Sequence, residues 1–341
     1  MTPLRIFTWH VHGSYLLYLV QSPHEFFVPV KPGRPNPYGG RGEPGGPFPW
    51  PDNLHEVPAD RVREQRFDCI LFQRRDQYTS DQYEILSPEQ RRLPKIFLEH
   101  DPPRESPTDT KHVVDDPNVL LVHVTHFNDL MWDSGRTPTR VIEHGVFAPE
   151  DVRYTGELER GIVVINHLAR RGRRLGLDVF ERARARVPLD LVGMGAEEAG
   201  GLGEVQHDDL PGFAARYRFF FNPIRYTSLG LAVCEAMMLG MPIVGLATTE
   251  MAATIENGVS GYVDTDVERL IERMHELLAD PGEARRLGTG ARRAARERFD
   301  IRRFADDWDR AFRLVMASPA RAARRGGLGG NGSTARAWVS A

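Results

Sequence analysis

The sequence has little cysteine, little lysine and no long apolar run. Only two of its 341 residues are cysteines, Cys69 and Cys234, and both lie in apolar strings. This excludes a framework of disulfides and indicates a reducing compartment. No stretch of 18 apolar residues occurs, and residues 1–5 lead into an expected strand without the apolar region of a signal peptide. We therefore expect a cytoplasmic protein.

Charge of either sign is also not in excess. The formal net charge is -3, and only three of the 44 basic residues are lysines, namely Lys31, Lys95 and Lys111. The whole molecule therefore lacks the basic character of an electrostatic nucleic-acid binder, and nucleic acid is not an expected partner. No strongly basic amphipathic helix is evident, so peripheral membrane contact is left open.

The length of the chain and its alternation of apolar strands with helices predict two α/β domains. A chain of 341 residues usually exceeds one core. Residues 1–148 form the first domain, whose strands are apolar on both faces, as in a covered parallel sheet. Residues 149–300 form the second, which begins with a polar linker through Arg160 and continues as strand–helix units. The expected strands lie at 4–9, 25–30, 67–72, 95–100, 119–125 and 139–142, then at 161–166, 189–193, 217–222, 243–246 and 261–263.

Two segments outside these strands have clear patterns. Residues 31–58 are crowded with proline and glycine and predict a long loop, whose Tyr38, Phe48 and Trp50 either cover an acceptor or pack on their own domain. Helices are expected at 175–186, 251–256, 267–279 and 281–298, and a terminal helix at 301–316 has an apolar stripe at helical spacing. We expect that stripe either to contact the first domain or to be ordinary core packing. Residues 317–341 are expected to be disordered.

The segment from Arg225 to Pro242 joins a glycine turn, a helix with one inward acid and a following strand. Pro223 ends the preceding strand, and Thr227 or Ser228 can cap the helix. The first amides near Gly230 would then point toward an anion such as a diphosphate. Glu235 lies in an otherwise apolar helix surface, where a carboxylate needs a hydroxyl or a cation as its partner. Simple pairing with an arginine remains the alternative.

This segment resembles the signature of glycosyltransferase family 4, the group 1 glycosyl transferases, which are retaining enzymes with the GT-B fold. Glu235-Ala236-Met237, Gly240, Pro242 and the strand that follows match that signature. The signature of the family also has a glutamate eight residues before the position of Glu235, where this chain has Thr227. Weaker similarities lie at 141–146, where His144 replaces an asparagine, and at 191–195 and 255–261.

The resemblance implies two Rossmann-like doubly wound domains facing across a cleft, and transfer of a hexosyl group from a nucleotide diphosphate sugar to a hydroxyl acceptor. It implies retention of anomeric configuration without a cofactor or a required metal. Glu235 would hold the ribose, Thr227 and Ser228 would lie near the sugar, and His100, which follows a strand, would contact that sugar. The donor side would also include Gly13, His167, Arg171, Gly193, Leu229, Gly230 and Leu231. His167 and Arg171 stand in the places of an arginine and a lysine that bind the diphosphate; a solvated helix start is the alternative for the arginines around 170–174.

Two further functions are compatible with the residues. His10 and His12 end the first strand as His-x-His, which resembles metal-dependent amidohydrolases that bind zinc through imidazoles. That function needs later ligands, and neither His207 nor His275 follows an evident strand. Asp264-Thr265-Asp266 could be a metal-binding Asp-x-Asp but is more simply a helix cap. Because Thr227 replaces a glutamate, a nucleotide-sugar-binding protein without turnover is the other alternative.

Overall fold

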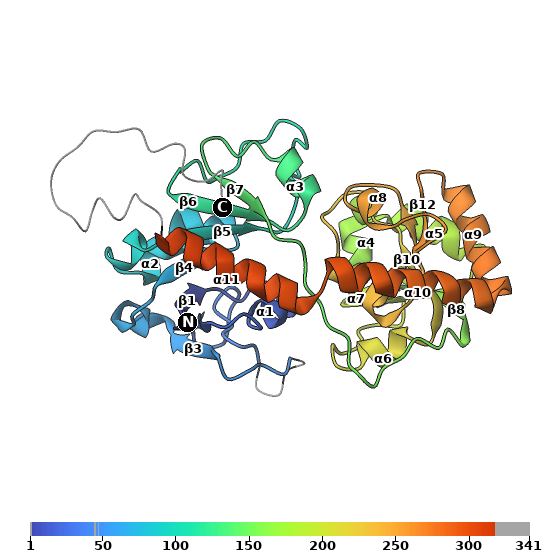
Figure 1. Ribbon diagram of the computed structural model, residues 1–341, viewed down its shortest axis with the longest axis horizontal. Coiled ribbons are helices and arrows are strands. Elements are labelled where there is room, and N and C mark those ends of the chain that lie inside the picture. The colour runs from blue at the N-terminus through green and yellow to red at the C-terminus, as the bar shows by residue number, and fades with distance from the viewer. Residues whose placement is uncertain (1, 44–45, 47, 318–341) are drawn as a thin grey trace. The chain divides into compact units, whose positions relative to one another are not determined.

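A computed structural model of the chain describes residues 2–43, 46 and 48–317 (Figure 1). The chain forms two compact units. The first comprises the residues up to Glu143 together with those from Arg302 onward, and the second comprises His144–Ile301. The chain therefore leaves the first unit after Glu143 rather than after residue 148, and it returns to it for the last helix.

The first unit has a seven-stranded sheet in the order β3-β2-β1-β4-β5-β6-β7, and its strands pair in parallel. The order reverses between β1 and β4, as in a doubly wound sheet. The strands are β1 (Arg5–Thr8), β2 (Glu25–Val30), β3 (Leu54–Pro58), β4 (Cys69–Phe72), β5 (Lys95–Glu99), β6 (Val119–His123) and β7 (Thr139–Val141). The helices are α1 (Gly13–Leu19), α2 (Gln82–Ile85), α3 (His126–Met131) and α11 (Ile301–Ala317).

The second unit has a five-stranded parallel sheet in the order β12-β11-β10-β8-β9. Here the order reverses between β8 and β10. The strands are β8 (Leu158–Val164), β9 (Leu189–Val192), β10 (Tyr217–Asn222), β11 (Ile243–Leu246) and β12 (Gly261–Asp264). The helices are α4 (Leu168–Arg171), α5 (Leu177–Arg184), α6 (Leu210–Ala214), α7 (Leu231–Leu239), α8 (Met251–Thr254), α9 (Val267–Ala279) and α10 (Pro281–Arg298), and a 3₁₀ turn, η4, spans Gly172–Leu175.

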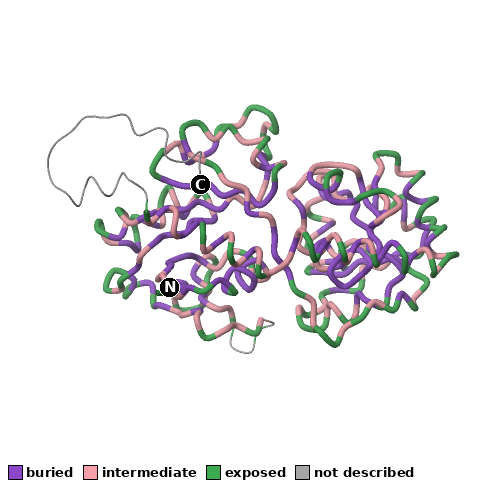
Figure 2. The backbone as a smooth tube through the Cα atoms, in the orientation of Figure 1, coloured by how far each residue is buried: buried purple, intermediate pink, exposed green. Residues whose placement is uncertain are grey.

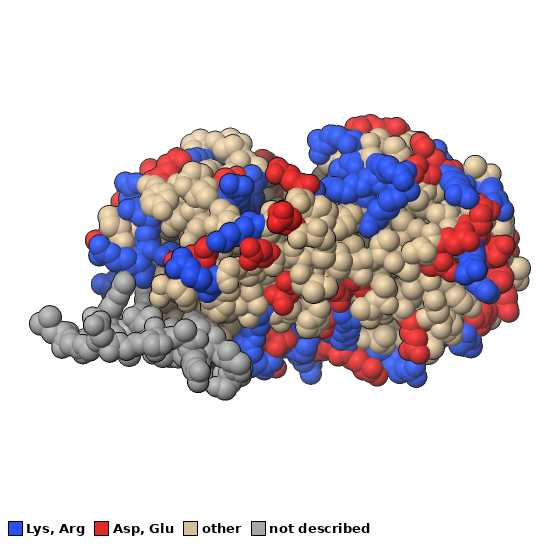
Figure 3. All heavy atoms as spheres, turned by 90° about the horizontal axis from the view of Figure 1, so that it is seen from above, with Lys and Arg blue, Asp and Glu red and all other residues tan. Residues whose placement is uncertain are grey.

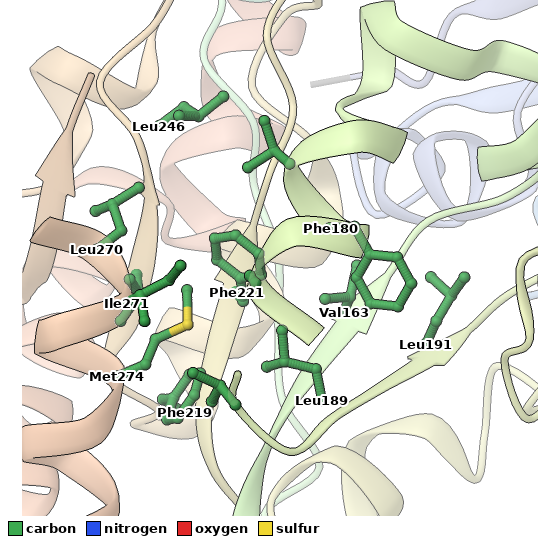
Figure 4. Close-up of a cluster of buried hydrophobic side chains, with 14 of the residues drawn as sticks. Val163, Phe180, Leu189, Leu191, Phe219, Phe221, Leu246, Leu270, Ile271 and Met274 are labelled. Atoms are coloured by element: carbon green, nitrogen blue, oxygen red, sulfur yellow. The ribbon is translucent and has the colours of Figure 1, made fainter. Parts of the chain in front are cut away.

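Each sheet is the centre of its unit's core, and buried backbone follows the strands of both (Figure 2). In the second unit, β10 is buried along its whole length, because helices cover both faces of a parallel sheet. Phe219 and Phe221 of β10 lie among side chains of β8, β9, α5 and α9 (Figure 4). This packing fixes where the loops at the ends of β8 and β10 leave the sheet.

Capping side chains define the starts of the long surface helices. Asp266 accepts a hydrogen bond from the Glu268 amide at 2.9 Å and so begins α9. Asp280 accepts from the amides of Gly282 and Glu283 at 2.8 and 3.0 Å, and Pro281 occupies the first turn of α10. The interpretation of Asp266 as a cap is confirmed.

Helix α11 packs on the sheet of the first unit. Its buried face consists of Phe304, Trp308, Ala311, Phe312 and Val315. Phe304 lies edge-on to Tyr15 with ring centroids 5.7 Å apart, and Phe312 lies edge-on to Phe26 at 6.1 Å. The apolar stripe thus completes the core of the first unit.

The predicted α/β class with two doubly wound domains is confirmed, but three local predictions were wrong. The last residues of the proline-rich stretch form β3. This is an edge strand, in which Pro58 is tolerated although it has no N–H to donate. Leu158 to Arg160 belong to β8 rather than to a linker. Helix α7 begins after Gly230, which lies two residues beyond Ser228, and no side chain caps it. Residues 318–341, expected to be disordered, lie outside the described residues.

Candidate functional site

The two units each gather polar residues where their strand order reverses. In a doubly wound sheet the loops that leave the carboxyl ends of the strands on either side of this point diverge, and ligands bind between them. In the second unit these are the loops after β8 and β10, which are adjacent parallel strands. In the first unit they are the loops after β1 and β4.

The loop after β8 turns sharply at His167. Its backbone is left-handed, with φ 53° and ψ 44°, an uncommon conformation for a residue with a side chain. The His167 amide donates to the Met194 carbonyl at 2.6 Å, and the Met194 amide donates to Asn166 Oδ1 at 2.9 Å. Two hydrogen bonds therefore join the turn after β8 to the glycine turn after β9.

The glycines of the β9 turn are required by this close approach. A Cβ on Gly193 would lie 2.7 Å from the Ile165 carbonyl oxygen, and one on Gly195 would lie 2.9 Å from His167 Nδ1. Both glycines also have positive φ angles, of 135° and 66°. Packing against the end of β8 is thus sufficient to explain Gly193, which the sequence placed at the donor.

The loop after β10 is held by two backbone anchors. The Arg174 carbonyl accepts hydrogen bonds from the amides of Arg225 and Tyr226, each at 3.2 Å. On the other side, His144 Nε2 donates to the Leu229 carbonyl at 2.8 Å, and the His144 side chain is buried. The position and direction of the Gly230 turn are therefore set by residues distant in the sequence, His144 among them.

Helix α7 starts at this turn with its first amides toward the carboxyl edge of the sheet. A Cβ on Gly230 would find no heavy atom of the described chain within 4 Å, so packing does not account for this glycine. Since no side chain caps α7, its first N–H groups and the positive end of the helix dipole are suited to an anion. Glu235 is half-buried on the same helix between the buried residues Cys234 and Ala236.

Arginines surround the same edge. Arg171 ends α4, and Arg173 and Arg174 follow in η4. Arg225 forms a two-pronged pair with Asp178, in which Nη2 and Oδ2 are 2.7 Å apart, and Arg173 pairs with the same carboxylate at 2.6 Å. Hydrogen bonding from Arg225 holds the pKa of Asp178 below its usual value. On the face shown in Figure 3, basic side chains gather in one dense patch of the second unit.

In the first unit, Gln73 orients His100. The Gln73 Nε2 group donates to the Trp9 carbonyl and to Thr8 Oγ1, both at 2.9 Å. Because a carbonyl only accepts, this fixes the amide so that its Oε1 faces His100 Nε2 at 3.0 Å. His100 Nε2 must then donate, which in the neutral ring leaves Nδ1 as the acceptor.

Two other side chains bracket His100. The rings of His12 and Tyr15 lie edge-on to it, with centroid distances of 4.7 and 4.8 Å. His10 is turned elsewhere and contacts the Gly40 carbonyl at 2.8 Å and the Trp50 ring. The two histidines of the His-x-His sequence therefore do not lie in one group of side chains.

Gly13 begins α1 beside the aromatic loop. A Cβ at this position would overlap the Phe48 ring, which explains the glycine by packing within the unit. Phe48 lies against Trp50, with ring centroids 5.1 Å apart. The aromatic residues of this loop were expected either to cover an acceptor or to pack on their own domain. At Gly13 the structure shows packing on their own domain.

The hydrolase alternative has the wrong architecture, because the fold has two open doubly wound sheets rather than a barrel. Over residues 2–43, 46 and 48–317, no group of three or more His, Cys, Asp or Glu side chains is arranged to hold a metal ion. The same part of the chain contains no helix that is both long and apolar enough to span a membrane.

Comparisons with known proteins agree with this architecture. Residues 160–280 match the family model described as glycosyl transferases group 1. A sucrose-phosphate synthase from Thermosynechococcus elongatus superposes with a TM-score of 0.68 at 17% identity, covering 92% of this chain and 99% of that one. Anabaena HepE, solved in complex with UDP, gives a TM-score of 0.62 at 12% identity over 92% of this chain and 100% of its own. The fold is GT-B.

One curated relative is similar in sequence. It is the GDP-mannose-dependent alpha-(1-6)-phosphatidylinositol monomannoside mannosyltransferase of Mycolicibacterium smegmatis, 29% identical over 227 residues, or 54% of this chain. The match spans 59% of the length of that relative. The sequence similarity to the group 1 glycosyl transferase model lies at residues 160–280, within the second unit.

The structure brings together, within the second unit, the loops that carry His167, Arg171, Gly193 and Leu229 through Leu231. Sequence reasoning missed two residues that organise the groups, Gln73 and Asn166. Both are polar and lie just beyond the end of a strand. Gln73 directly follows β4, and Asn166 follows Ile165, the buried apolar residue after β8. That position was the available signal, since strand ends feed the edge where ligands bind.

Proposed function

We propose that this protein transfers a sugar from a nucleotide diphosphate donor to a hydroxyl acceptor, with retention of anomeric configuration and without a cofactor or a required metal. The nucleotide would bind the second unit, and we place the protein in the cytoplasm. Retention is proposed from the resemblance of the Glu235 segment to the group 1 enzymes.

The observation that carries the proposal is the uncapped start of α7 at the point where the second sheet reverses. Its amides, the open approach at Gly230 and the arginines of α4 and η4 suit a diphosphate. Glu235 lies in the second turn of α7, where a half-buried carboxylate can accept from the two ribose hydroxyls. The left-handed backbone of His167 adds a strained residue at the same edge, a feature common at binding sites.

In the proposed reaction the bond between the anomeric carbon and the diphosphate oxygen breaks, and the acceptor hydroxyl bonds to the same face of that carbon. Negative charge accumulates on the leaving diphosphate, where Arg171 and the amides of α7 would stabilise it. A phosphate oxygen can take the acceptor proton, so no separate protein base is needed. Thr227 and Ser228 would lie near the sugar. His100 would contact the sugar, with its ring held by Gln73.

Thermal stabilisation by ligands tests the donor site directly. GDP, UDP and ADP, then GDP-mannose and UDP-glucose, are added with chelator present; the named relatives use GDP-mannose or bind UDP. We expect one base to raise Tm, because a ligand that binds the native state stabilises it in proportion to its affinity. Glu235→Ala should abolish this shift, whereas Glu159→Ala, at an exposed position of β8, should keep it.

The outcomes separate the proposal from its alternatives. If no nucleotide stabilises the wild-type protein, the donor site is refuted. If one nucleotide sugar binds but is neither transferred nor hydrolysed with any offered acceptor, Thr227 marks a binding protein without turnover. Sugar transfer with inversion, read from the anomeric proton coupling in the product, would refute retention alone.

A further inference from the structure

A basic cavity lies in the second unit at the other end of α7. It has a volume of about 540 Å³ and is bordered by Leu239 and Gly240 at the end of α7, by one face of α10 and by the segment at 153–154. Five arginines line it: Arg153, Arg285, Arg292, Arg293 and Arg296. The single acid in the lining is Glu297. Since α7 runs away from Gly230, this cavity is separate from the site proposed for the donor.

The arginines of α10 differ sharply in their partners. Outside the cavity, Arg286 pairs with Glu283 at 2.7 Å and Arg298 pairs with Glu250 at 2.5 Å. In the cavity, by contrast, none of the five arginines has a carboxylate within 4.0 Å in the part of the chain that the structure describes. Carboxylates therefore neutralise Arg286 and Arg298 of this helix, whereas the arginines of the cavity have no such partner among the described residues.

Arg292 is the most constrained member of the group. Its Nε atom is buried and has no hydrogen-bond partner among the described residues. Burial lowers the pKa of its guanidinium, and the neighbouring charges of Arg296 and Arg153 lower it further. A buried donor without an acceptor and a set of like charges both cost free energy, and one bound anion with several oxygens would offset both costs.

We propose that this cavity binds a phosphate-bearing ligand. Guanidinium groups match phosphate oxygens in pairs, and the volume suits a small molecule or a lipid headgroup rather than a macromolecule. A free phosphorylated metabolite and the headgroup of an anionic lipid share this chemistry. The proposal does not depend on the identity of the donor.

Calorimetry with inorganic pyrophosphate tests the first source. The parent protein and every variant in this experiment carry Arg171→Gln, so that pyrophosphate binding at the proposed donor site is weakened in all of them. Arg292→Gln/Arg296→Gln should weaken the affinity about ten-fold or more, because each removes a charged hydrogen-bond donor. The matched control is Arg182→Gln/Arg186→Gln, which removes the same charge from arginines paired with Glu268 and should change the affinity less than about two-fold.

Sedimentation with phosphatidylcholine vesicles, with and without phosphatidic acid, tests the second source. Binding that needs phosphatidic acid and is lost in the Arg292→Gln/Arg296→Gln protein assigns the cavity to a lipid headgroup; pyrophosphate binding alone assigns it to a free phosphate. Both measurements are repeated with the Arg296→Glu protein, because this change lies at an exposed position and carries little risk to folding. The proposal is overturned if neither probe binds, or if both bind the variants as tightly as the parent.

Discussion

Gln73 is a polar side chain buried at 6% exposure, and its side-chain amide bonds three groups at once. It donates to Thr8 and Trp9 and accepts from His100, while the backbone N–H of Gln73 donates to Gln77 Oε1 at 2.8 Å. We expect Gln73→Leu to lower the free energy of unfolding by about 2–3 kcal/mol, since it leaves the Trp9 carbonyl and His100 without this partner. Side-chain ¹⁵N shifts should show His100 losing its preference for the Nε2–H form.

Gln21→Leu is the control for this change, because Gln21 is an exposed glutamine whose side chain donates to the Leu17 carbonyl of its own turn. Its stability should change by less than about 0.5 kcal/mol. An unchanged His100 tautomer in Gln73→Leu would show that Gln73 does not position the ring.

His123 is a fully buried histidine at the end of β6, and burial lowers its pKa to about 3. In the unfolded chain its pKa is near 6.5, so below that pH the unfolded state takes up a proton that the native state does not. His123 therefore contributes a loss of about 2 kcal/mol of stability between pH 7 and pH 5. Chemical denaturation across this range should show a flatter pH dependence for His123→Leu; equal slopes would place the titration in another residue.

Among the elements, α10 and α7 pack through a pair of glycines. A Cβ on Gly288 would overlap the Gly240 carbonyl oxygen, so Gly288→Ala must move one helix. We expect a loss of roughly 1–3 kcal/mol or more in the free energy of unfolding. Gly212→Ala in α6 is the matched change, because a Cβ there meets nothing within 4 Å of the described chain, and it should be neutral or stabilising by up to about 1 kcal/mol. Equal effects on urea midpoints would contradict a close contact at Gly288.

The sequence predicted those elements whose local pattern agrees with their tertiary setting. Strand β10 has three consecutive phenylalanines at its centre and is buried throughout, and α9 and α10 have both an amphipathic pattern and an Asp cap. Strand β3 was missed because an edge position tolerates proline and polar residues that argue against a central strand. The start of β8 was missed because Glu159 and Arg160 face solvent.

From the sequence, the candidate site could be predicted only for residues that lie near the end of one strand; contacts between distant segments could not be predicted. Gly230 was predicted from its glycine turn and Arg171 from the resemblance to the group 1 enzymes, and the structure brings their loops to adjacent strands. The hydrogen bond from His144 to Leu229, by contrast, joins residues 85 positions apart, which no local pattern encodes. The explanation of Gly13 by Phe48 is likewise a tertiary contact.

On the scale of the whole molecule, the first unit depends on a helix from the far end of the chain. Trp308 of α11 is fully buried there, and we expect Trp308→Ala to cost about 3–5 kcal/mol in the stability of that unit. Scanning calorimetry should show the transition of the first unit moving to lower temperature while that of the second stays in place. Arg310→Ala, at an exposed position of the same helix, should move neither; a shift of both transitions in Trp308→Ala would show that the units unfold together.

This discontinuity has a consequence for synthesis on the ribosome. The second unit is contiguous and possesses all its strands once Ile301 has been added, whereas the first must wait for α11. At roughly 5–20 residues per second, the sheet that is made first remains without its last helix for about 10–30 s. During that time the surface around Phe26 and Tyr15 that α11 later covers is open to chaperones, and the half of the chain made second can finish folding before the half made first.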